Sequence, residues 1–381
     1  MRLDLFEMER LQSTWENRVK FNLSESSVHP MSVRELISDR DFHDRLLDAP
    51  LAYNQSNGTD ELREAIASLY PGATRDNIEV TNGGSEANFV TIYSMLEPGD
   101  EVVVILPNYG QIWGLTTSLG MAVRAVHLRG DAAWSPDLDE LESSVTGRTK
   151  MIVVCNPNNP TGAVLSEGEM EAIIRIASGC GAWILADEIY QGSERSGETT
   201  PSFHGKYDRV IVTNGLSKAY GLPGLRIGWI VAPGELIARM WSYHDYTTIA
   251  PGTLSDLLAR VALSTGGRGL CLERTRNICR HNFPIFRKWV EEHGSMFSLI
   301  EPHAGAIACV HYDLSINSTE LTHRLLHEKS VLVVPGDHFG MDRYLRIGYG
   351  PPADYLQQAL GHIDDLLGEL RASIKAGSAR T

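Results

Sequence analysis

The amino-acid sequence predicts an α/β fold in which a mostly parallel sheet lies between helices, with a smaller α+β domain beside it. Three observations lead to this prediction. From about Tyr53 onward, short apolar runs alternate with segments of helical periodicity. The two ends of the chain lack this alternation. The length of 381 residues is enough for two or three domains, which suits one large domain and one small one.

The expected strands are short runs of mainly β-branched or aliphatic residues, bounded by Gly, Pro, Asn or Asp. Such runs are typical of strands that are buried on both faces. They are Glu101–Leu106, Met151–Cys155, Trp183–Ala186, Val210–Thr213 and Trp229–Val231. A helical pattern over Ser166–Ala177 separates the second run from the third. Because parallel strands need crossover connections of this kind, the spacing favours a parallel sheet.

The two ends of the chain are expected to form one small domain together. Residues 1–50 begin with a helix-like segment that is followed by a polar loop. After about residue 280 the pattern becomes mixed, and the chain closes with an amphipathic helix whose apolar residues recur at spacings of three and four. We therefore expect residues 1–50 and 281–381 to flank a large domain of residues 51–280.

The composition excludes several classes of function. The formal net charge is −14, and such a surface repels nucleic acid and anionic membranes. The five cysteines are spread out without CxxC pairs, which favours free thiols in the cytoplasm over disulfides or a metal site. The N-terminus has no apolar signal region, and no apolar run approaches the roughly 20 residues that span a bilayer.

The first segment whose residues suit ligand binding is Val80–Asn88, which reads VTNGGSEAN. Two consecutive glycines allow a sharp turn from a strand into a helix that runs to about Met95. The start of that helix presents free N–H groups to an anion. A tight loop without a ligand is the alternative. The segment matches neither GxGxxG nor a Walker loop, so dinucleotide and nucleoside triphosphate binding lack support.

The second segment, NPNNPTG at residues 156–162, directly follows an expected strand. Loops at the carboxyl ends of strands are where α/β sheets bind ligands, and Asn159 can offer an amide donor there. Asp187 ends the next expected strand, where an acid is costly to bury without a cationic partner. Tyr190 follows three residues later.

The third segment places Lys218 shortly after an expected strand and Arg226 eight residues further on. A lysine that is desolvated or flanked by a cation is an amine nucleophile toward carbonyl compounds, and arginine binds anions with a planar fork. A single lysine in a loop is usually only a solvated charge. The three segments in this order argue against that interpretation.

Taken together, NPNNPTG, DEIY, GLSKAYG and RIGW resemble the fold-type-I enzymes that depend on pyridoxal 5′-phosphate (PLP), in the aminotransferase class I/II family. The resemblance extends from about residue 20 to the C-terminus. It implies that Lys218 holds the cofactor covalently and that Asp187 pairs with the pyridine nitrogen. It also implies that Asn159 and Tyr190 donate to the phenolic oxygen of the ring. The catalytic residues expected from it are Lys218, Asp187 and Tyr190.

The same resemblance implies the remaining contacts to cofactor and substrate. Tyr109 would stack on the ring. The phosphate would be held by Gly84, Ser85 and Glu86, with Ser217 and Arg226 as side-chain clamps. Tyr53 would reach the phosphate in a partner subunit, which implies a symmetric homodimer. Arg346, with Asn159, would bind the α-carboxylate of the substrate.

The sequence departs from the common family pattern in two places. Gly215 stands where many relatives have serine, three residues before the lysine, and this removes one expected phosphate contact. The N-terminal loop at residues 23–29 reads LSESSVH instead of containing glycine. Together with the segments LSKAYGLPGLRIGW, HDYTTIAP and SVLVVPGDHFG, that loop resembles the branch of the family that contains capreomycidine synthase. Enzymes of that branch eliminate a hydroxyl group from a hydroxyarginine and close a guanidine ring.

The predicted function is transamination of an L-amino acid with a keto acid as acceptor. Glu25 in the N-terminal loop is a candidate partner for a basic, arginine-like substrate side chain, and a solvated loop charge is the alternative. A PLP-dependent lyase or cyclase that performs elimination and ring closure is the second hypothesis. A PLP-sensing transcription regulator would need a DNA-binding domain, and residues 1–50 are neither long nor basic enough for one.

Overall fold

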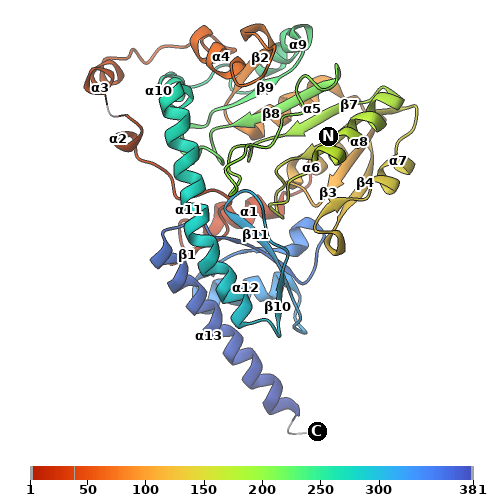
Figure 1. The fold of residues 1–381 in the computed structure, drawn as a ribbon, viewed down its shortest axis with the longest axis vertical. Helices are drawn as coiled ribbons and strands as arrows, with labels where there is room; N and C mark the ends of the chain where they lie inside the picture. The colour runs from red at the N-terminus through yellow and green to blue at the C-terminus, as the bar shows by residue number, and fades with distance from the viewer. Residues whose placement is uncertain (1–2, 38, 379–381) are drawn as a thin grey trace.

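The computed structural model describes residues 3–37 and 39–378, and its largest element is an eight-stranded sheet (Figure 1). The strand order is β2-β9-β8-β7-β6-β3-β4-β5. The strands are β2 Ile78–Thr81, β3 Glu101–Leu106, β4 Ala122–Arg129, β5 Ser135–Pro136, β6 Thr149–Cys155, β7 Trp183–Asp187, β8 Val210–Gly215 and β9 Gly228–Val231. Neighbours from β8 through β7, β6 and β3 to β4 are parallel. Strands β2, β9 and β5 pair antiparallel. The mostly parallel sheet is thus confirmed.

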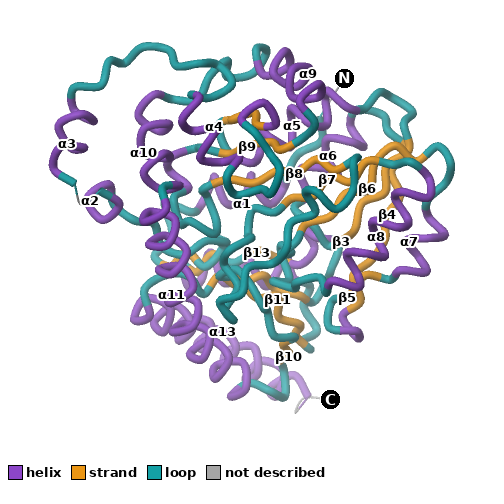
Figure 2. Tube along the Cα trace, turned by 45° about the horizontal axis from the view of Figure 1, so that its top comes forward, coloured by secondary structure: helices purple, strands orange, loops and turns teal. Residues whose placement is uncertain are grey.

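Helices cover both faces of this sheet, as Figure 2 shows. Alternate residues of a strand point to opposite faces, so Ile152 and Val154 of β6 join one core while Met151 and Val153 join another. The first core is closed by α4 Asp60–Ala67, α8 Glu167–Cys180, α10 Thr253–Leu263 and the start of α11 Thr265–Glu292. The second core is closed by α5 Gly84–Met95, α6 Gly110–Ser118 and α9 Gly234–His244.

The small domain is built from both ends of the chain, as the sequence predicts. Its sheet is antiparallel with the order β10-β11-β14-β13, and β1 pairs parallel with β12. The bounds are β1 Phe21–Asn22, β10 Phe297–Leu299, β11 Ile307–Tyr312, β12 Val331–Leu332, β13 Val334–Pro335 and β14 Tyr344–Gly348. Phe21 and Leu23 from the N-terminal segment pack into one core with α11, α12 Ser318–Lys329 and α13 Ala353–Ser378.

The remaining helices are α1 Glu7–Trp15, α2 Val33–Leu36, α3 Arg40–Leu47 and α7 Leu138–Ser144. Helix α11 links the two domains, because its first turns pack against the large sheet and its later turns enter the core of the small domain (Figure 1). No helix within residues 3–37 and 39–378 combines the length and apolar character needed to cross a membrane.

All five expected strands are present, and β3 has the predicted bounds. The run Trp229–Val231 forms β9, which pairs antiparallel with β8. Strand β4 is not among the expected strands, because arginines interrupt its apolar residues and its first half is largely solvent-exposed. The proposed boundary at residue 280 falls inside α11. The division into 1–50, 51–280 and 281–381 stays a prediction.

Candidate active site

A cavity of about 370 Å³ lies between the carboxyl ends of β6, β7 and β8 and the small domain. Ligands bind at this end of parallel strands in α/β proteins. Helix α1, the loop after β1, the start of α5 and strand β14 complete its walls. The sequence-predicted residues that line it are Glu25, Gly84, Ser85, Tyr109, Asn159, Asp187, Tyr190, Ser217, Lys218, Arg226 and Arg346.

Asp187 is a buried carboxylate at the floor of the cavity, with 6% of its surface exposed. Its Oδ1 accepts the Ile189 N–H at 3.1 Å, and its Oδ2 accepts the side-chain amide of Asn88 at 3.3 Å. Burial raises the pKa of Asp187, while these bonds and the charge of Lys218 act against the rise. A positively charged ring nitrogen would compensate the buried negative charge.

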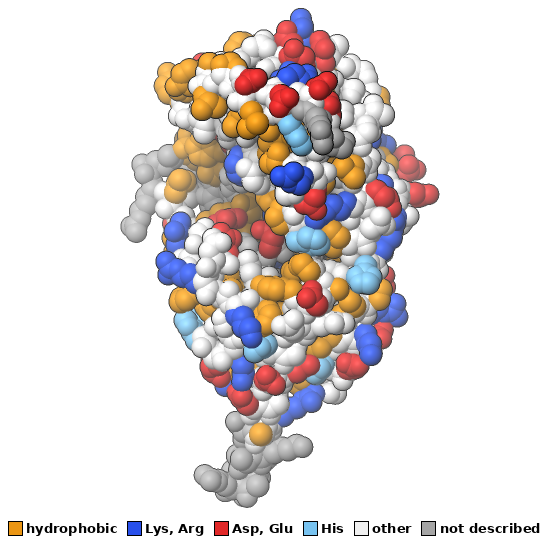
Figure 3. Space-filling model, turned by 90° about the vertical axis from the view of Figure 1, so that its left-hand side faces the viewer, with side chains coloured by type: hydrophobic (Ala, Val, Ile, Leu, Met, Phe, Trp, Pro, Cys, Tyr) orange, Lys and Arg blue, Asp and Glu red, His pale blue; other side chains and the backbone are white. Residues whose placement is uncertain are grey.

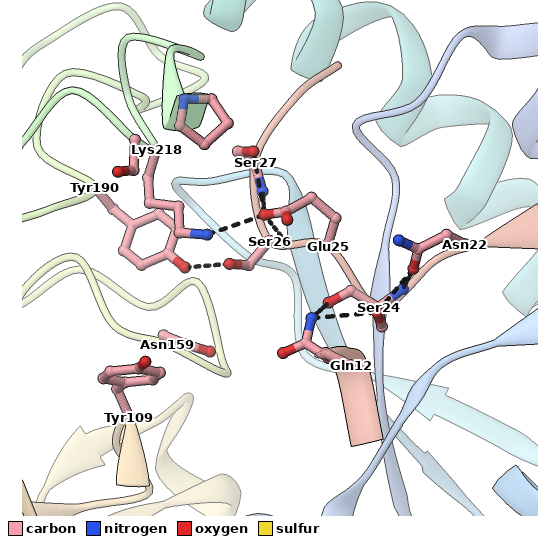
Figure 4. A network of polar contacts seen from close by, with 12 residues as sticks. Gln12, Asn22, Ser24, Glu25, Ser26, Ser27, Tyr109, Asn159, Tyr190 and Lys218 are labelled. Carbon is pink, nitrogen blue, oxygen red and sulfur yellow. Dashed lines mark hydrogen bonds and ion pairs between the residues drawn. The ribbon is translucent and has the colours of Figure 1, made fainter. Parts of the chain in front are cut away.

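Lys218 points across the cavity toward the N-terminal loop (Figure 4). Its Nζ donates to Glu25 Oε1 at 2.9 Å, and the same oxygen accepts the backbone N–H groups of Ser26 at 2.8 Å and Ser27 at 3.1 Å. Burial disfavours ionised Glu25, but the charge of Lys218 and these hydrogen bonds outweigh it and lower the pKa of Glu25 to about 2. Burial also acts against the ammonium of Lys218, and Glu25 raises the pKa of that amine.

Arg346 is almost fully buried, with 1% of its surface exposed. Its Nη2 donates to Ser24 O at 2.6 Å and its Nη1 to Asn159 Oδ1 at 3.0 Å. Its Nε is buried and has no hydrogen-bond partner among the described residues. The guanidinium is thus fixed by neutral oxygens and keeps its positive charge available for a carboxylate.

The two predicted tyrosines lie on the cavity wall, and each hydroxyl already has a partner. Tyr190 Oη donates to Ser26 Oγ at 2.8 Å, and Tyr109 Oη donates to Glu9 Oε1 at 2.8 Å. Burial raises the pKa of Tyr190, so its hydroxyl remains a donor at neutral pH. The expected roles of Tyr190 as a donor to the ring and of Tyr109 as a stacking partner stay predictions.

The start of α5 forms a cradle for an anion. Gly83 adopts a φ of 93°, which L side chains rarely adopt, and a Cβ there would collide with the guanidinium of Arg226. Arg226 Nη1 lies 3.4 Å from Ser217 Oγ. The first N–H groups of a helix lack carbonyl partners, so Gly84, Ser217 and Arg226 surround a position suited to phosphate.

These features fit pyridoxal 5′-phosphate. The cavity offers a buried carboxylate for the pyridine nitrogen, an amine for the aldehyde and a cradle for the phosphate. Within the described part of the chain, no group of three or more His, Cys, Asp or Glu side chains is arranged to hold a metal ion.

Two predicted residues do not line the cavity. The Glu86 side chain turns away from the cradle toward His244, with Glu86 Oε2 at 3.4 Å from His244 Nε2. The expected role of Glu86 as part of the phosphate-binding turn stays a prediction. Tyr53 lies in the connection between α3 and α4 and is 88% exposed. Its expected contact with a partner subunit stays a prediction.

Sequence reasoning missed several polar residues of the cavity. Glu9 and Gln12 line it from α1, and Glu16 lines it from the C-terminal cap of that helix. Their spacing of three and four residues is the signal that would have grouped them on one helix face. Asn88 lies within the glycine-turn segment, but only the fold brings it to Asp187. Ser26 meets Tyr190 from 164 positions away, and no local pattern indicates that contact.

Comparison with known proteins identifies the class. Residues 42–363 match the family model described as aminotransferase class I and II, so the chain belongs to this family. Capreomycidine synthase from Streptomyces vinaceus is 31% identical over 360 residues, which cover 92% of this chain and 90% of that protein.

Solved structures give the same result. A PLP-dependent aminotransferase from Streptococcus suis is 34% identical with a TM-score of 0.91, covering 97% of this chain and 99% of that one. The PLP-dependent cyclase OrfR is 28% identical with a TM-score of 0.88, covering 97% and 98%. The protein is an enzyme of fold type I, and its cofactor is pyridoxal 5′-phosphate.

Proposed function

We propose that this enzyme is an aminotransferase for an L-amino acid with a basic side chain. The observation that carries the choice of substrate is the acceptor wall, which we define as Glu9, Gln12, Glu16 and Glu25. They line the same cavity as Lys218 and Arg346.

Lys218 and Asp187 carry the chemistry in this proposal. Pyridoxal 5′-phosphate, when bound, supplies a ring that accepts the electron pair left at the substrate Cα. The Asp187 carboxylate holds a proton at the ring nitrogen, and its burial strengthens that interaction. The Lys218 amine takes the proton from the substrate Cα, and the Glu25 carboxylate stabilises the ammonium group that forms.

The other lining residues hold the reactants in place. Asn159 and Tyr190 donate to the phenolic oxygen of the ring, and Tyr109 stacks on the ring. The start of α5 at Gly84 and Ser85, with the side chains of Ser217 and Arg226, binds the phosphate. Arg346 binds the α-carboxylate of the substrate, which orients the Cα–H bond toward Lys218.

The acceptor wall supports a cationic substrate side chain. Gln12 is 9% exposed; its Nε2 donates to Ser24 O at 2.9 Å, and its oxygen points toward the side of the cavity where Tyr109 and Asn159 lie (Figure 4). The carboxylate of Glu16 makes no hydrogen bond or ion pair with another residue that the structure describes. Burial and the negative charges of Glu25 and Glu9 raise the pKa of Glu16. A bound cation would relieve this repulsion.

Among the described residues that line the cavity, no further cation is present for an acidic substrate side chain. The cations of the cavity are Lys218, Arg226 and Arg346, and each has a role toward the cofactor or the α-carboxylate. A guanidinium has five N–H donors and no acceptor, so it complements a wall that offers only oxygens. Glu25 is the least available of the four, because Lys218 already binds its Oε1.

A second candidate function is elimination followed by ring closure. The likeness to capreomycidine synthase over 92% of this chain and to the cyclase OrfR supports it. The cavity residues serve both reactions, because each begins with removal of the Cα proton. The two reactions differ in stoichiometry, since transamination needs a keto acid and cyclisation does not.

The test is turnover of purified holoenzyme with L-arginine or a hydroxylated arginine, with and without a keto acid, followed by mass spectrometry of all products. Transamination predicts product only with the acceptor and an equal amount of newly formed amino acid. Product that lacks the hydroxyl oxygen and forms without an acceptor would establish the second candidate instead. No product from any amino acid in a broad panel would overturn both.

We further propose a homodimer located in the cytoplasm. Large hydrophobic side chains are exposed on α3, the connection to α4 and the segment after α9, and Figure 3 shows hydrophobic side chains gathered on the upper part of one face. The exposed hydrophobic residues of these three segments include Leu47, Leu51, Tyr53, Tyr246 and Ile249. Exposed apolar surface of this kind is typical of subunit interfaces. The five free thiols support a reducing compartment.

A further inference from the structure

A buried histidine lies directly behind the phosphate cradle, between two carboxylates. His244 Nδ1 is 2.7 Å from Glu79 Oε1, and His244 Nε2 is 3.2 Å from Thr248 Oγ1 and 3.4 Å from Glu86 Oε2. The side chains of His244 and Glu79 have no exposed surface. Since both ring nitrogens face acceptors, the protonated imidazolium fits this position.

Several groups set the charge state of this cluster. Burial acts against the imidazolium, but Glu79 and Glu86 outweigh it and raise the pKa of His244 to about 9. Burial raises the pKa of Glu79 to about 7, with Asp245 adding to the rise, while His244 and then Arg63 oppose it. His244 is also the last residue of α9, where the carbonyl end of the helix favours a cation.

Glu86 occupies a position that conflicts with phosphate binding. It is the third residue of α5, whose N-terminus forms the cradle. Its Oε2 accepts the N–H of Asn82 at 2.5 Å and its Oε1 accepts the Thr248 hydroxyl at 2.8 Å, so it fastens the turn that leads into the cradle. Burial disfavours its charge, yet His244 and these bonds lower the pKa of Glu86 to about 2. An uncompensated carboxylate at this helix end would compete with a phosphate for the same positive potential.

We propose that His244 is the internal counter-ion of Glu86, and that it allows one helix end to carry a structural carboxylate and still bind the cofactor phosphate. Glu86 then holds the turn at Asn82 without repelling the phosphate. His244 is a positioning residue in this scheme, since it acts through Glu86 and does not line the cavity. The inference rests on the assignment of the cradle to the phosphate.

The test compares equilibrium binding of PLP and of pyridoxal, which lacks the phosphate, to the apoenzyme by absorbance titration. For His244→Gln we expect PLP to bind roughly tenfold more weakly, with pyridoxal binding unchanged. The double variant His244→Gln/Glu86→Gln should recover most of the PLP affinity, because it removes both charges. Equal losses for both ligands, or no recovery in the double variant, would overturn the proposal.

Two further measurements test the counter-ion role of His244 even if the His244→Gln variant does not fold. Glu86→Gln should bind PLP at least as tightly as the wild type, and a selective loss of PLP affinity would contradict the counter-ion role. In the wild type, the ratio of PLP to pyridoxal affinity should fall as the pH rises through about 9, because His244 then loses its proton. The double variant should show no such fall. If neither ligand binds any variant or the wild type, the cofactor site itself is wrongly assigned.

Discussion

At the scale of single residues, one carboxylate, that of Glu25, stabilises the positive charge of the Lys218 amine. Glu25 is anchored by two backbone N–H groups and presents its Oε1 to the Lys218 Nζ. Glu25 was expected to meet a substrate side chain, and its role toward the substrate stays a prediction. Its observed contact supports a different function, which is to stabilise the protonated amine during proton transfer.

The covalent role of Lys218 leads to a direct prediction. Reduction of the holoenzyme with borohydride should fix the cofactor to the peptide that contains Lys218, and Lys218→Ala should bind the cofactor only reversibly and lose turnover. Peptide mapping by mass spectrometry and a turnover assay measure these outcomes. Lys150, an exposed lysine remote from the cavity, provides a matched control as Lys150→Ala. Label on any other lysine would refute the assignment.

At the scale of elements, one face of α1 carries the substrate preference that we propose. Its carboxylates and the oxygen of Gln12 lie opposite the cofactor site, so a short helix from the first 16 residues completes a cavity built mainly by the large domain. Asp187 ends strand β7 and Arg346 lies within β14, whereas Glu9 and Gln12 lie on a separate helix.

Helix α1 provides a matched pair of variants. We expect Glu16→Gln to reduce the ratio of kcat/KM for arginine over citrulline, its neutral isostere, by roughly tenfold or more, since a charged hydrogen bond contributes about 1.5–3 kcal/mol. Glu7→Gln on the same helix changes an exposed carboxylate that does not line the cavity, and should leave the ratio unchanged. Equal use of arginine and citrulline by the wild type would contradict the basic-substrate proposal.

Some elements and site residues can be predicted from the sequence, and others cannot. Apolar runs predict the central strands because those residues are buried on both faces of the sheet. The chemical segments and the family resemblance together name eleven of the twenty-one residues that line the cavity. Strand β4 is not predicted because its arginines obscure the two-residue period of apolar side chains. Contacts such as Tyr190 with Ser26 and Arg346 with Asn159 depend on how distant segments pack, and no local pattern carries that information.

At the scale of the whole molecule, Tyr53 links the proposed active site to the proposed dimer. It projects into solvent from the exposed hydrophobic region, remote from the cavity of its own chain. If Tyr53 completes the phosphate site of a partner subunit, each chain carries a residue that acts only in the active site of the other chain. Such sharing makes activity depend on assembly.

Mixing inactive variants measures this dependence. Subunits with Lys218→Ala keep an intact Tyr53, and subunits with Tyr53→Ala keep an intact Lys218. After denaturation and refolding together, the mixture should show more activity than either variant alone, because each hybrid dimer contains one complete site. A mixture no more active than its components would show that Tyr53 acts within its own chain or not at all.

The pairing of β1 with β12 has a consequence for biosynthesis. The Lys20 N–H donates to Ser330 Oγ across 310 positions of the chain, and the loop beyond β1 supplies Glu25 to the cavity. Contacts this distant in sequence form late, since the intervening chain must first be made and ordered. A ribosome that has released the cofactor-binding strands has not yet translated Arg346. The nascent chain therefore has no complete site for an amino acid until nearly its full length has emerged, and premature termination yields a product without one.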